Sequence, residues 1–252
     1  MFENLEYTDF MRKFYNETEN FVLKVNELLY ELKSIKSYTF MLFSESEKIG
    51  YVILNKLLSQ YMISYFYLCD ERLYVPAFNE VRTAIEVLRL LRLYTQDKKF
   101  RDEYLKNDNF DFRKTSDYAY TQSKVNKRLD ELEKEIRSSK LFTGTPVLRN
   151  HSFTKGSAYS EIHSELSKWS HALNVNLIFP IFVNENKIKL GIYNDETVYS
   201  DIFLKKYTEL ICLLCMEQYD LLDMYLKTGN HEVKECYLQM LKNYDEYIKK
   251  FY

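Results

Sequence analysis

The segment from Tyr74 to Gln96 constrains the fold of this chain more than any other. It reads YVPAFNEVRTAIEVLRLLRLYTQ, with apolar residues on nearly every helical turn. Pro76 suits the first turn of a helix, where the missing backbone N–H of proline would have no helical partner. The segment is therefore predicted to form a helix that is buried on most of its circumference. We take this helix as the centre around which the rest of the chain folds.

The surroundings of this helix are predicted to be helical as well. The 252 residues include five glycines and three prolines, too few for the many turns of an all-β protein. Six further segments have helical periodicity, namely residues 3–36, 44–69, 115–139, 160–174, 195–227 and 231–251. The first is read as one helix or two, with a break near Asn16–Glu19. The second begins at a capping Ser44 or Ser46.

The apolar side of the predicted 44–69 helix is assigned from its spacing. This side is expected to carry Ile49, Val52, Ile53, Leu57, Tyr61 and Tyr65. The charged 115–139 segment is interpreted as a solvated helix tied to the body by one narrow stripe, rather than as an electrostatic partner surface. The last helix, 231–251, either packs on the body or serves a second subunit.

Residues 177–193 interrupt the helical pattern. Ile188, Leu190 and Ile192 alternate with period two, which predicts a strand, and Pro180 confines the preceding strand to an edge. The predicted fold class is all-α, a multi-helix bundle of about seven to nine helices with this one small β-hairpin. Its organisation is an N-terminal helical segment (1–44), a helical core domain (45–228) and a C-terminal helix (229–252).

Two polar stripes are predicted to face each other in this bundle. Residues three and four apart share a helix face. By that spacing one stripe within the central helix contains Asn79, Arg82, Glu86 and Arg89. A second stripe, within 160–174, contains Ser160, Ser164, Ser167 and His171. Charges in a mostly buried helix must be paired or reach water, so the two stripes are expected to meet.

Arg82, Glu86 and His171 are the candidate catalytic residues. Histidine can act as acid or base near neutral pH, arginine can neutralise an oxyanion or phosphate, and glutamate can hold either in place. These groups would be sufficient for metal-independent RNA cleavage, in which a 2′-hydroxyl attacks the adjacent phosphate. The alternative, which we favour, is a buried polar network in which Arg82 pairs with Glu86 while Ser167 and His171 bond across to them.

The candidate binding residues are Arg89, Ser167 and three residues of one irregular segment. Residues 141–156 contain Gly144, Pro146 and Gly156, and carry Arg149, His151 and Lys155 with little acid between them. This segment is either an anion-contacting loop or a plain connector, and the connector is the favoured interpretation. His163 is expected to be exposed, and no role is assigned to it.

Several familiar classes of site find no support. No phosphate-binding loop, HExxH or GxSxG pattern occurs, so neither a cofactor nor a metal is predicted. Cys212 and Cys215 have CxxC spacing within an apolar helix and lack a second ligand pair, which favours core packing over a metal site. The formal net charge of −2 argues against a surface that attracts nucleic acid as a whole.

A cytoplasmic location without membrane insertion is predicted. Four cysteines in apolar contexts do not form a disulfide framework. The first ten residues, MFENLEYTDF, include acidic residues and lack the apolar run of a signal peptide. The most apolar windows, residues 51–69 and 207–226, contain too many polar residues for an ordinary membrane-spanning helix.

Two resemblances follow from these residues. Arg82-Thr-Ala-Ile-Glu86 in an apolar helix, then Leu166-Ser167-Lys-Trp-Ser-His171 near a helix end, resembles a bacterial helical family described only as a domain of unknown function. Proteins of that family are often hypothetical or associated with defence. The resemblance covers about residues 45–225 and implies a helical fold that brings the Arg, Glu and His together. More loosely, the chain looks like the dimeric HEPN ribonucleases, although their Arg and His lie close together in one helix.

Three hypotheses for function follow. The leading one is a helical interaction or sensing protein of a prokaryotic antiviral defence or toxin–antitoxin system, with a polar site at Arg82, Glu86 and His171. The second is a metal-independent HEPN-like ribonuclease effector, in which Arg89 and the 149–155 region bind RNA phosphates. The third is a structural subunit that forms homo-oligomers through its terminal helices. The expected partner is therefore another protein or a second copy, with RNA as the alternative.

Overall fold

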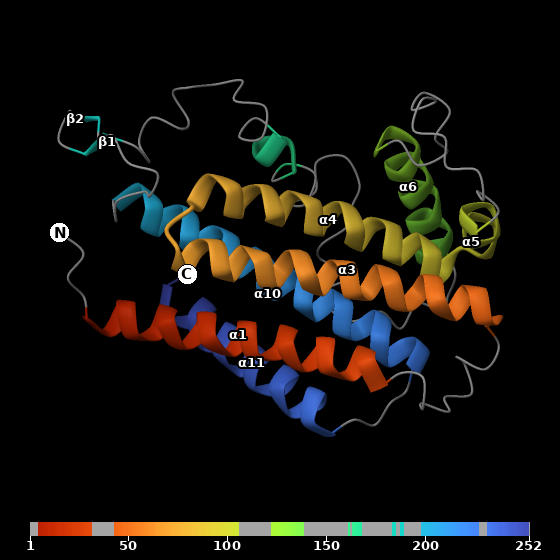
Figure 1. Cartoon of the computed structure of the whole chain (residues 1–252), viewed down its shortest axis with the longest axis horizontal. Coiled ribbons are helices and arrows are strands. Elements are labelled where there is room, and N and C mark those ends of the chain that lie inside the picture. The colour runs from red at the N-terminus through yellow and green to blue at the C-terminus, as the bar shows by residue number, and fades with distance from the viewer. Residues whose placement is uncertain are drawn as a thin grey trace.

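The computed structural model is a bundle of helices (Figure 1). It describes residues 5–31, 43–105, 122–138, 161, 163–167, 183–184, 187–188, 198–226 and 231–251. The helices with defined bounds are α1 (Leu5–Glu31), α3 (Glu45–Asp70), α4 (Tyr74–Gln96), α5 (Lys98–Leu105), α6 (Gln122–Ser138), α10 (Val198–Leu226) and α11 (His231–Phe251). Residues 163–167 are also helical. The predicted all-α class is confirmed for these residues.

The small β element is described only in part. Strand β1 (Val183–Asn184) pairs antiparallel with β2 (Lys187–Ile188), with Val183 opposite Ile188. The remainder of the hairpin predicted at 177–193 lies outside the described residues. A hairpin of the predicted length is therefore not shown.

Helix α4 is the central element, as its sequence predicts. It contacts α3, α5, α6 and α10, and it begins at Tyr74 and ends at Gln96 as expected. Phe78 is fully buried, with its ring centroid 4.4 Å from that of Tyr207 in α10. Even Arg89 is buried, so α4 is enclosed on most sides and its charged groups must find partners within the protein.

Helices α3 and α4 form an antiparallel hairpin joined by residues 71–73. Ser44 begins α3 with a capping box, in which its hydroxyl accepts the Glu47 N–H and the Glu47 carboxylate accepts the Ser44 N–H. The predicted cap is thus confirmed. In the connection, Arg72 has φ 56°, a left-handed conformation uncommon for residues other than glycine. Figure 1 shows the two helices side by side along the front of the bundle.

The predicted apolar side of α3 is wrong for Ile49 and Ile53, which are 59% and 51% exposed. Tyr65 is fully buried as predicted, and Val52, Leu57 and Tyr61 are partly buried against the core. The side chains that α3 buries also include Tyr51, Leu54 and Leu58, which the prediction left out. Apolar residues occur all around this helix, so periodicity alone could not select the face that meets the other helices.

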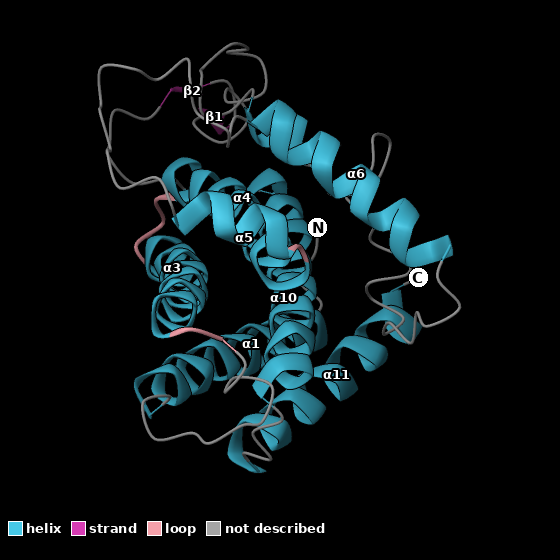
Figure 2. Ribbon diagram, turned by 90° about the vertical axis from the view of Figure 1, so that its right-hand side faces the viewer, coloured by secondary structure: helices cyan, strands magenta, loops and turns pink. Residues whose placement is uncertain are grey.

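Helices α1 and α11 lie antiparallel on the lower side of the bundle, and Figure 2 shows α10 between them and α4. The Asn20 side chain donates to Cys236 Sγ at 3.5 Å, and Lys24 lies 3.6 Å from Glu232. Helix α1 is continuous through the predicted break at Asn16–Glu19. None of the helices in the described ranges is long and apolar enough to cross a membrane.

Candidate functional site: a polar cluster on α4

The candidate site lies on α4, where Arg82 and Glu86 are one turn apart. Arg82 Nε lies 3.2 Å from Glu86 Oε1, and each side chain is about one fifth exposed, 22% and 23%. The predicted pairing along the helix is therefore present, and both groups are within reach of solvent.

His163, from the short helix at 163–167, completes the cluster. Its Nε2 lies 2.8 Å from the same Glu86 oxygen, Oε1, that Arg82 approaches. Burial raises the pKa of Glu86, but the His163 hydrogen bond and the charges of Arg82, His163 and Arg89 outweigh burial and leave the pKa below its usual value. An ionised carboxylate only accepts hydrogen bonds, so Nε2 of His163 carries the proton.

Arg89 lies on the same side of α4 but inside the protein. It is 1% exposed, and burial lowers the pKa of its guanidinium to about 10, against the opposing charges of Glu86 and Asp130. The predicted role in binding RNA phosphates needs a guanidinium at the surface. Arg89 is instead buried, and its charge contributes to lowering the pKa of Glu86. We refer to Arg82, Glu86, Arg89 and His163 as the α4 polar cluster.

The short helix has a second polar attachment, to α10. Glu165 lies 2.6 Å from Lys206 Nζ and accepts a hydrogen bond from the Tyr207 hydroxyl at 3.1 Å. Leu166, which follows Glu165 in the sequence, is fully buried. The 163–167 helix is thus docked on α4 through His163 and on α10 through Glu165.

The structure describes only part of the predicted site. Arg82, Glu86 and Arg89 lie together, but His171, Arg149, His151 and Lys155 are outside the described residues. Ser167 was expected to bond across to α4, whereas its hydroxyl donates to the His163 carbonyl oxygen at 2.8 Å, within its own helix. Serine commonly satisfies its hydroxyl in this way inside a helix.

His163 is the functional candidate that sequence reasoning missed. Its side chain is 16% exposed and bonded to Glu86, not solvated as expected. The signal available was the helical spacing of His163 and Ser167, which places both on one face beside the apolar Leu166. A histidine beside a buried leucine is better placed to meet another helix than to face water.

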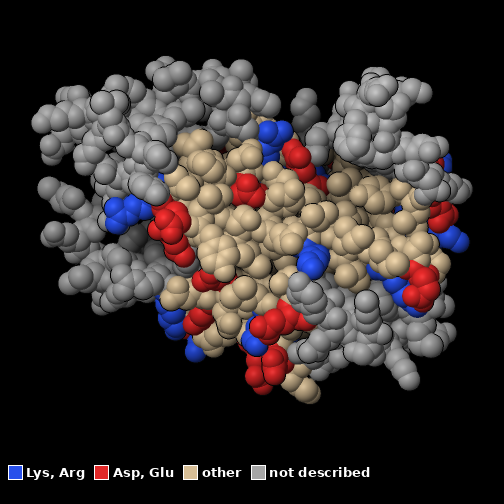
Figure 3. All heavy atoms as spheres, in the orientation of Figure 1, with Lys and Arg blue, Asp and Glu red and all other residues tan. Residues whose placement is uncertain are grey.

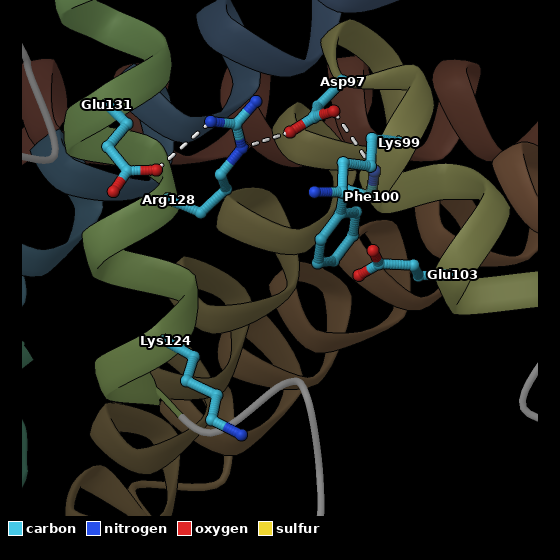
Figure 4. Close-up of a pocket in the computed structure, with 7 residues that line it drawn as sticks. All are labelled: Asp97, Lys99, Phe100, Glu103, Lys124, Arg128 and Glu131. Atoms are coloured by element: carbon cyan, nitrogen blue, oxygen red, sulfur yellow. Dashed lines mark hydrogen bonds and ion pairs between the residues drawn. The ribbon is translucent and has the colours of Figure 1, made fainter.

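A separate pocket of about 360 Å³ opens between α5 and α6. It is lined by Asp97, Lys99, Phe100, Glu103, Lys124, Arg128 and Glu131. Figure 4 shows the Arg128 guanidinium between Asp97 and Glu131. Asp97 also accepts the Phe100 N–H at 3.1 Å, at the start of α5. The lining is balanced between three basic and three acidic residues, and the Arg128 contacts join α6 to α4 and α5.

The two α10 cysteines belong to the core. Cys212 and Cys215 are fully buried, and burial raises the pKa of both thiols well above the usual value. Cys215 Sγ lies 3.8 Å from Met62 Sδ. A thiol held in its neutral form is a poor nucleophile and metal ligand, and across the part of the chain that is described no cluster of side chains suits a metal ion.

Comparisons of the chain with protein-family models, with curated proteins and with solved structures found no match.

Proposed function

We propose that this chain is a helical interaction and sensing protein, and that its docked 163–167 helix is the part that a ligand or partner moves. The single observation that carries the proposal is the double use of Glu86 Oε1, which Arg82 and His163 both contact. These contacts hold one helix against another, and they use the carboxylate that a catalytic site would need for substrate or proton transfer.

The charges of the cluster support binding over catalysis on RNA. Arg82 and Arg89 face Glu86, and Asp130 also acts on Arg89. The cluster therefore has little excess positive charge to attract a phosphate backbone. A partner that supplies its own carboxylate, or its own basic group, could instead exchange places with one member of the cluster.

The contacts of the 163–167 helix are weak enough for it to dock reversibly on α4 and α10. The His163 and Glu165 contacts both involve partly exposed side chains, and such contacts stabilise by about 1 kcal/mol each. Leu166 adds roughly 2 kcal/mol through its burial. A ligand needs only a differential affinity of that order to shift the helix between two positions.

Replacing Glu86 by glutamine is expected to loosen the docked helix without unfolding the bundle. The amide keeps the shape of the side chain but removes the charge that Arg82 and His163 share. We expect hydrogen exchange at the backbone amides of 163–167 to become about tenfold faster, which corresponds to about 1.4 kcal/mol. Peptide-resolved exchange measured by mass spectrometry tests this.

Glu232→Gln is the matched control, because Glu232 is an exposed carboxylate paired with Lys24, on the α1–α11 side of the bundle. It should leave exchange in 163–167 unchanged. Equal protection of these amides in wild type and Glu86→Gln would contradict the docking role of the cluster.

The interaction itself is tested by isolating tagged chains from cells of the encoding organism. Wild type, Glu86→Gln and Glu232→Gln would be compared by quantitative mass spectrometry of the proteins recovered with each. We expect at least one partner whose recovery changes several-fold in Glu86→Gln only. If all three chains recover the same amount of every partner, the α4 polar cluster is not needed for binding.

A metal-independent ribonuclease is the second candidate. The observation in its favour is that an imidazole and a guanidinium both contact one carboxylate, and that all three groups are partly exposed. Growth and RNA integrity would be followed during induced expression of wild type, His163→Ala and His171→Ala. RNA cleavage by the wild type that one folded histidine variant abolishes would establish this candidate in place of the leading one.

A role in a prokaryotic antiviral defence or toxin–antitoxin system is part of the same proposal. Its support is the resemblance carried by Arg82, Glu86, Leu166 and Ser167, of which the first two lie on α4 and the last two in the docked helix. Such systems depend on switchable contacts between proteins, which a reversibly docked helix would supply.

A further inference from the structure

The 163–167 helix depends on the two helices on which it is docked. A helix of fewer than about 12–15 residues is marginal alone in water, because nucleation fixes several residues before one hydrogen bond forms. Even the whole segment predicted from sequence, 160–174, is no longer than that. Figure 1 shows the helix, in green, above α4. The surface of α4 and α10 that it covers is therefore able to order a helical segment.

The contacts of this helix follow its circumference in a definite order. At about 3.6 residues per turn, Leu166 lies about 60° around the helix from His163, and Glu165 lies about 100° further on. His163 contacts α4, Leu166 is fully buried and Glu165 contacts α10. The exposed Glu161 and Ser164 fall on the opposite side. The docked side thus presents a base, an apolar residue and an acid, in that order.

The surface under this helix is held together without it. Helices α4 and α10 contact each other directly, and the fully buried rings of Phe78 and Tyr207 lie 4.4 Å apart. Glu86 and Lys206, which receive the two charged contacts, therefore keep their places when the helix leaves. We refer to Glu86, Lys206 and Tyr207 as the helix-docking surface. It offers a carboxylate on α4, and an ammonium group and a hydroxyl on α10.

We propose that the partner of this protein is a helical segment that binds the helix-docking surface in place of 163–167. The inference rests on the proposed function, in which that helix is the part that moves, and it specifies the partner. By the order of the contacts, the partner segment has a basic residue, an acid two positions later and a large apolar residue one position after the acid. Amphipathic helices are commonly recognised through such anchors on one face. The chain's own helix is then a built-in competitor.

The tethered helix sets the affinity that an outside segment must exceed. A segment in the same chain competes at an effective concentration of the order of millimolar. A free peptide therefore gains access in proportion to the fraction of molecules whose own helix is undocked. Leu166→Ala removes the one fully buried side chain of the described helix, so it raises this fraction. From the usual cost of such a truncation, we expect peptide affinity to rise about tenfold or more in that variant.

Other exposed parts of the described residues specify a partner less closely. On the described part of the face in Figure 3, basic and acidic atoms are scattered and mostly lie beside one another. That face therefore has no broad charge of one sign to select a partner. Helix α3 exposes Ile49, Ile53 and Tyr67, but no observation indicates what would cover them. The helix-docking surface differs, because a helical segment of known sequence is seated on it.

Fluorescence polarisation of a labelled peptide tests the proposal. The peptide has the sequence of residues 158–168 and is held helical by a lactam bridge between positions 160 and 164. By helical spacing, these two positions lie away from the contact side. The receptors are the Leu166→Ala protein and wild type, each checked for folding by circular dichroism. We expect saturable binding to Leu166→Ala, and binding to wild type that is about tenfold weaker.

An exchange of charges tests the register of the contact. In the Leu166→Ala background, Lys206→Glu should weaken binding of the peptide several-fold, and a peptide carrying Glu165→Lys should restore it. Lys234→Glu is the matched control, because it replaces an exposed lysine on α11, and it should bind both peptides as its parent does. Absence of binding to Leu166→Ala overturns the proposal. Equal affinity for wild type and Leu166→Ala, or binding that Lys206→Glu leaves unchanged, also overturns it.

Failure of this inference is distinguishable from failure of the proposed function. If the peptide does not bind while Glu86→Gln still accelerates exchange in 163–167 and changes the recovery of a partner, the partner is not a helix of this kind and only this inference is wrong. If Glu86→Gln changes neither exchange nor recovery, the proposed function itself is wrong.

Discussion

Replacing Arg101 by alanine is expected to lower the free energy of unfolding by about 3 kcal/mol. Arg101 is 8% exposed, and its Nε donates to Glu47 Oε1 at 2.7 Å. Its Nη1 donates to the carbonyl oxygens of Tyr94, at 2.7 Å, and Thr95, at 3.3 Å. The guanidinium also lies 4.5 Å above the Phe43 ring. Alanine would leave a poorly hydrated carboxylate and two carbonyl groups without this donor, and urea denaturation would measure the loss.

The pH dependence of the stability loss in Arg101→Ala tests whether Glu47 is the group responsible for it. Burial raises the pKa of Glu47, but hydrogen bonds from the Ser44 N–H, Arg101 and the Ser44 hydroxyl outweigh burial and leave the pKa below its usual value. A carboxyl whose folded pKa is lowered stabilises the protein above its unfolded pKa, and this contribution is lost as pH falls through the folded pKa. The difference in free energy of unfolding between wild type and Arg101→Ala should therefore become smaller as the pH falls.

Lys48→Ala is the control for the Arg101 prediction. Lys48 pairs with Glu45 at 2.6 Å in the same first turn of α3, but that glutamate side chain is 84% exposed. Exposed pairs contribute little, about 0.5 kcal/mol, so Lys48→Ala should be nearly neutral. If the free energies of unfolding of wild type and Arg101→Ala instead differ by the same amount at acid pH, Arg101 stabilises the protein through packing rather than through its contact with Glu47.

Gly50→Ala is expected to destabilise the protein by about 2 kcal/mol, against its helix propensity. Alanine in place of a helical glycine ordinarily stabilises by about 1 kcal/mol. Here the added Cβ would lie 2.8 Å from Tyr94 Cζ and closer still to the hydroxyl. The Tyr94 ring is fully buried, and its hydroxyl donates to the Glu47 carbonyl oxygen at 2.8 Å. Overpacking of about 1–3 kcal/mol and the loss of this bond exceed the propensity gain.

A double-mutant cycle with Tyr94→Phe tests this cause. Removing the hydroxyl relieves the closest contact, so the pair Gly50→Ala and Tyr94→Phe should be less destabilised than the sum of the single changes. Thermal unfolding of the four proteins would give the coupling. Simple additivity would show that the Tyr94 hydroxyl is not the cause of the cost. A stabilised Gly50→Ala would show that the helices move apart at negligible cost.

The sequence predicts the helices of this protein better than their contacts. The bounds of α4 and α11 follow from periodicity and end signals, and the Ser44 cap follows from local chemistry. Local patterns sufficed in these cases because the interactions responsible are within one or two turns. On α3 the prediction is wrong for Ile49 and Ile53, because apolar residues surround this helix and only distant helices decide that Tyr51 is buried and Ile49 is not.

In the candidate site, too, the residues within one helix could be predicted from sequence and the contact between helices could not. Arg82, Glu86 and Arg89 could be grouped from spacing alone, since one helix holds all three. That His163 contacts Glu86 could not be predicted from spacing. The contact depends on how the 163–167 helix packs on α4, which is many residues away along the chain. His163 and Ser167 share a helix face, and a shift of this short helix along α4 would change which residue reaches Glu86.

The pairing of α1 with α11 has a consequence for synthesis. Asn20 and Cys236, which meet in the folded protein, are 216 residues apart in the chain. At translation rates of about 5–20 residues per second, α1 leaves the ribosome roughly 10–40 s before its partner exists. During that interval Phe21, Val22 and Val25, all buried in the finished fold, lack one of the surfaces that cover them. The nascent chain must therefore keep α1 soluble on α3, or on a chaperone, until α10 and then α11 are synthesised.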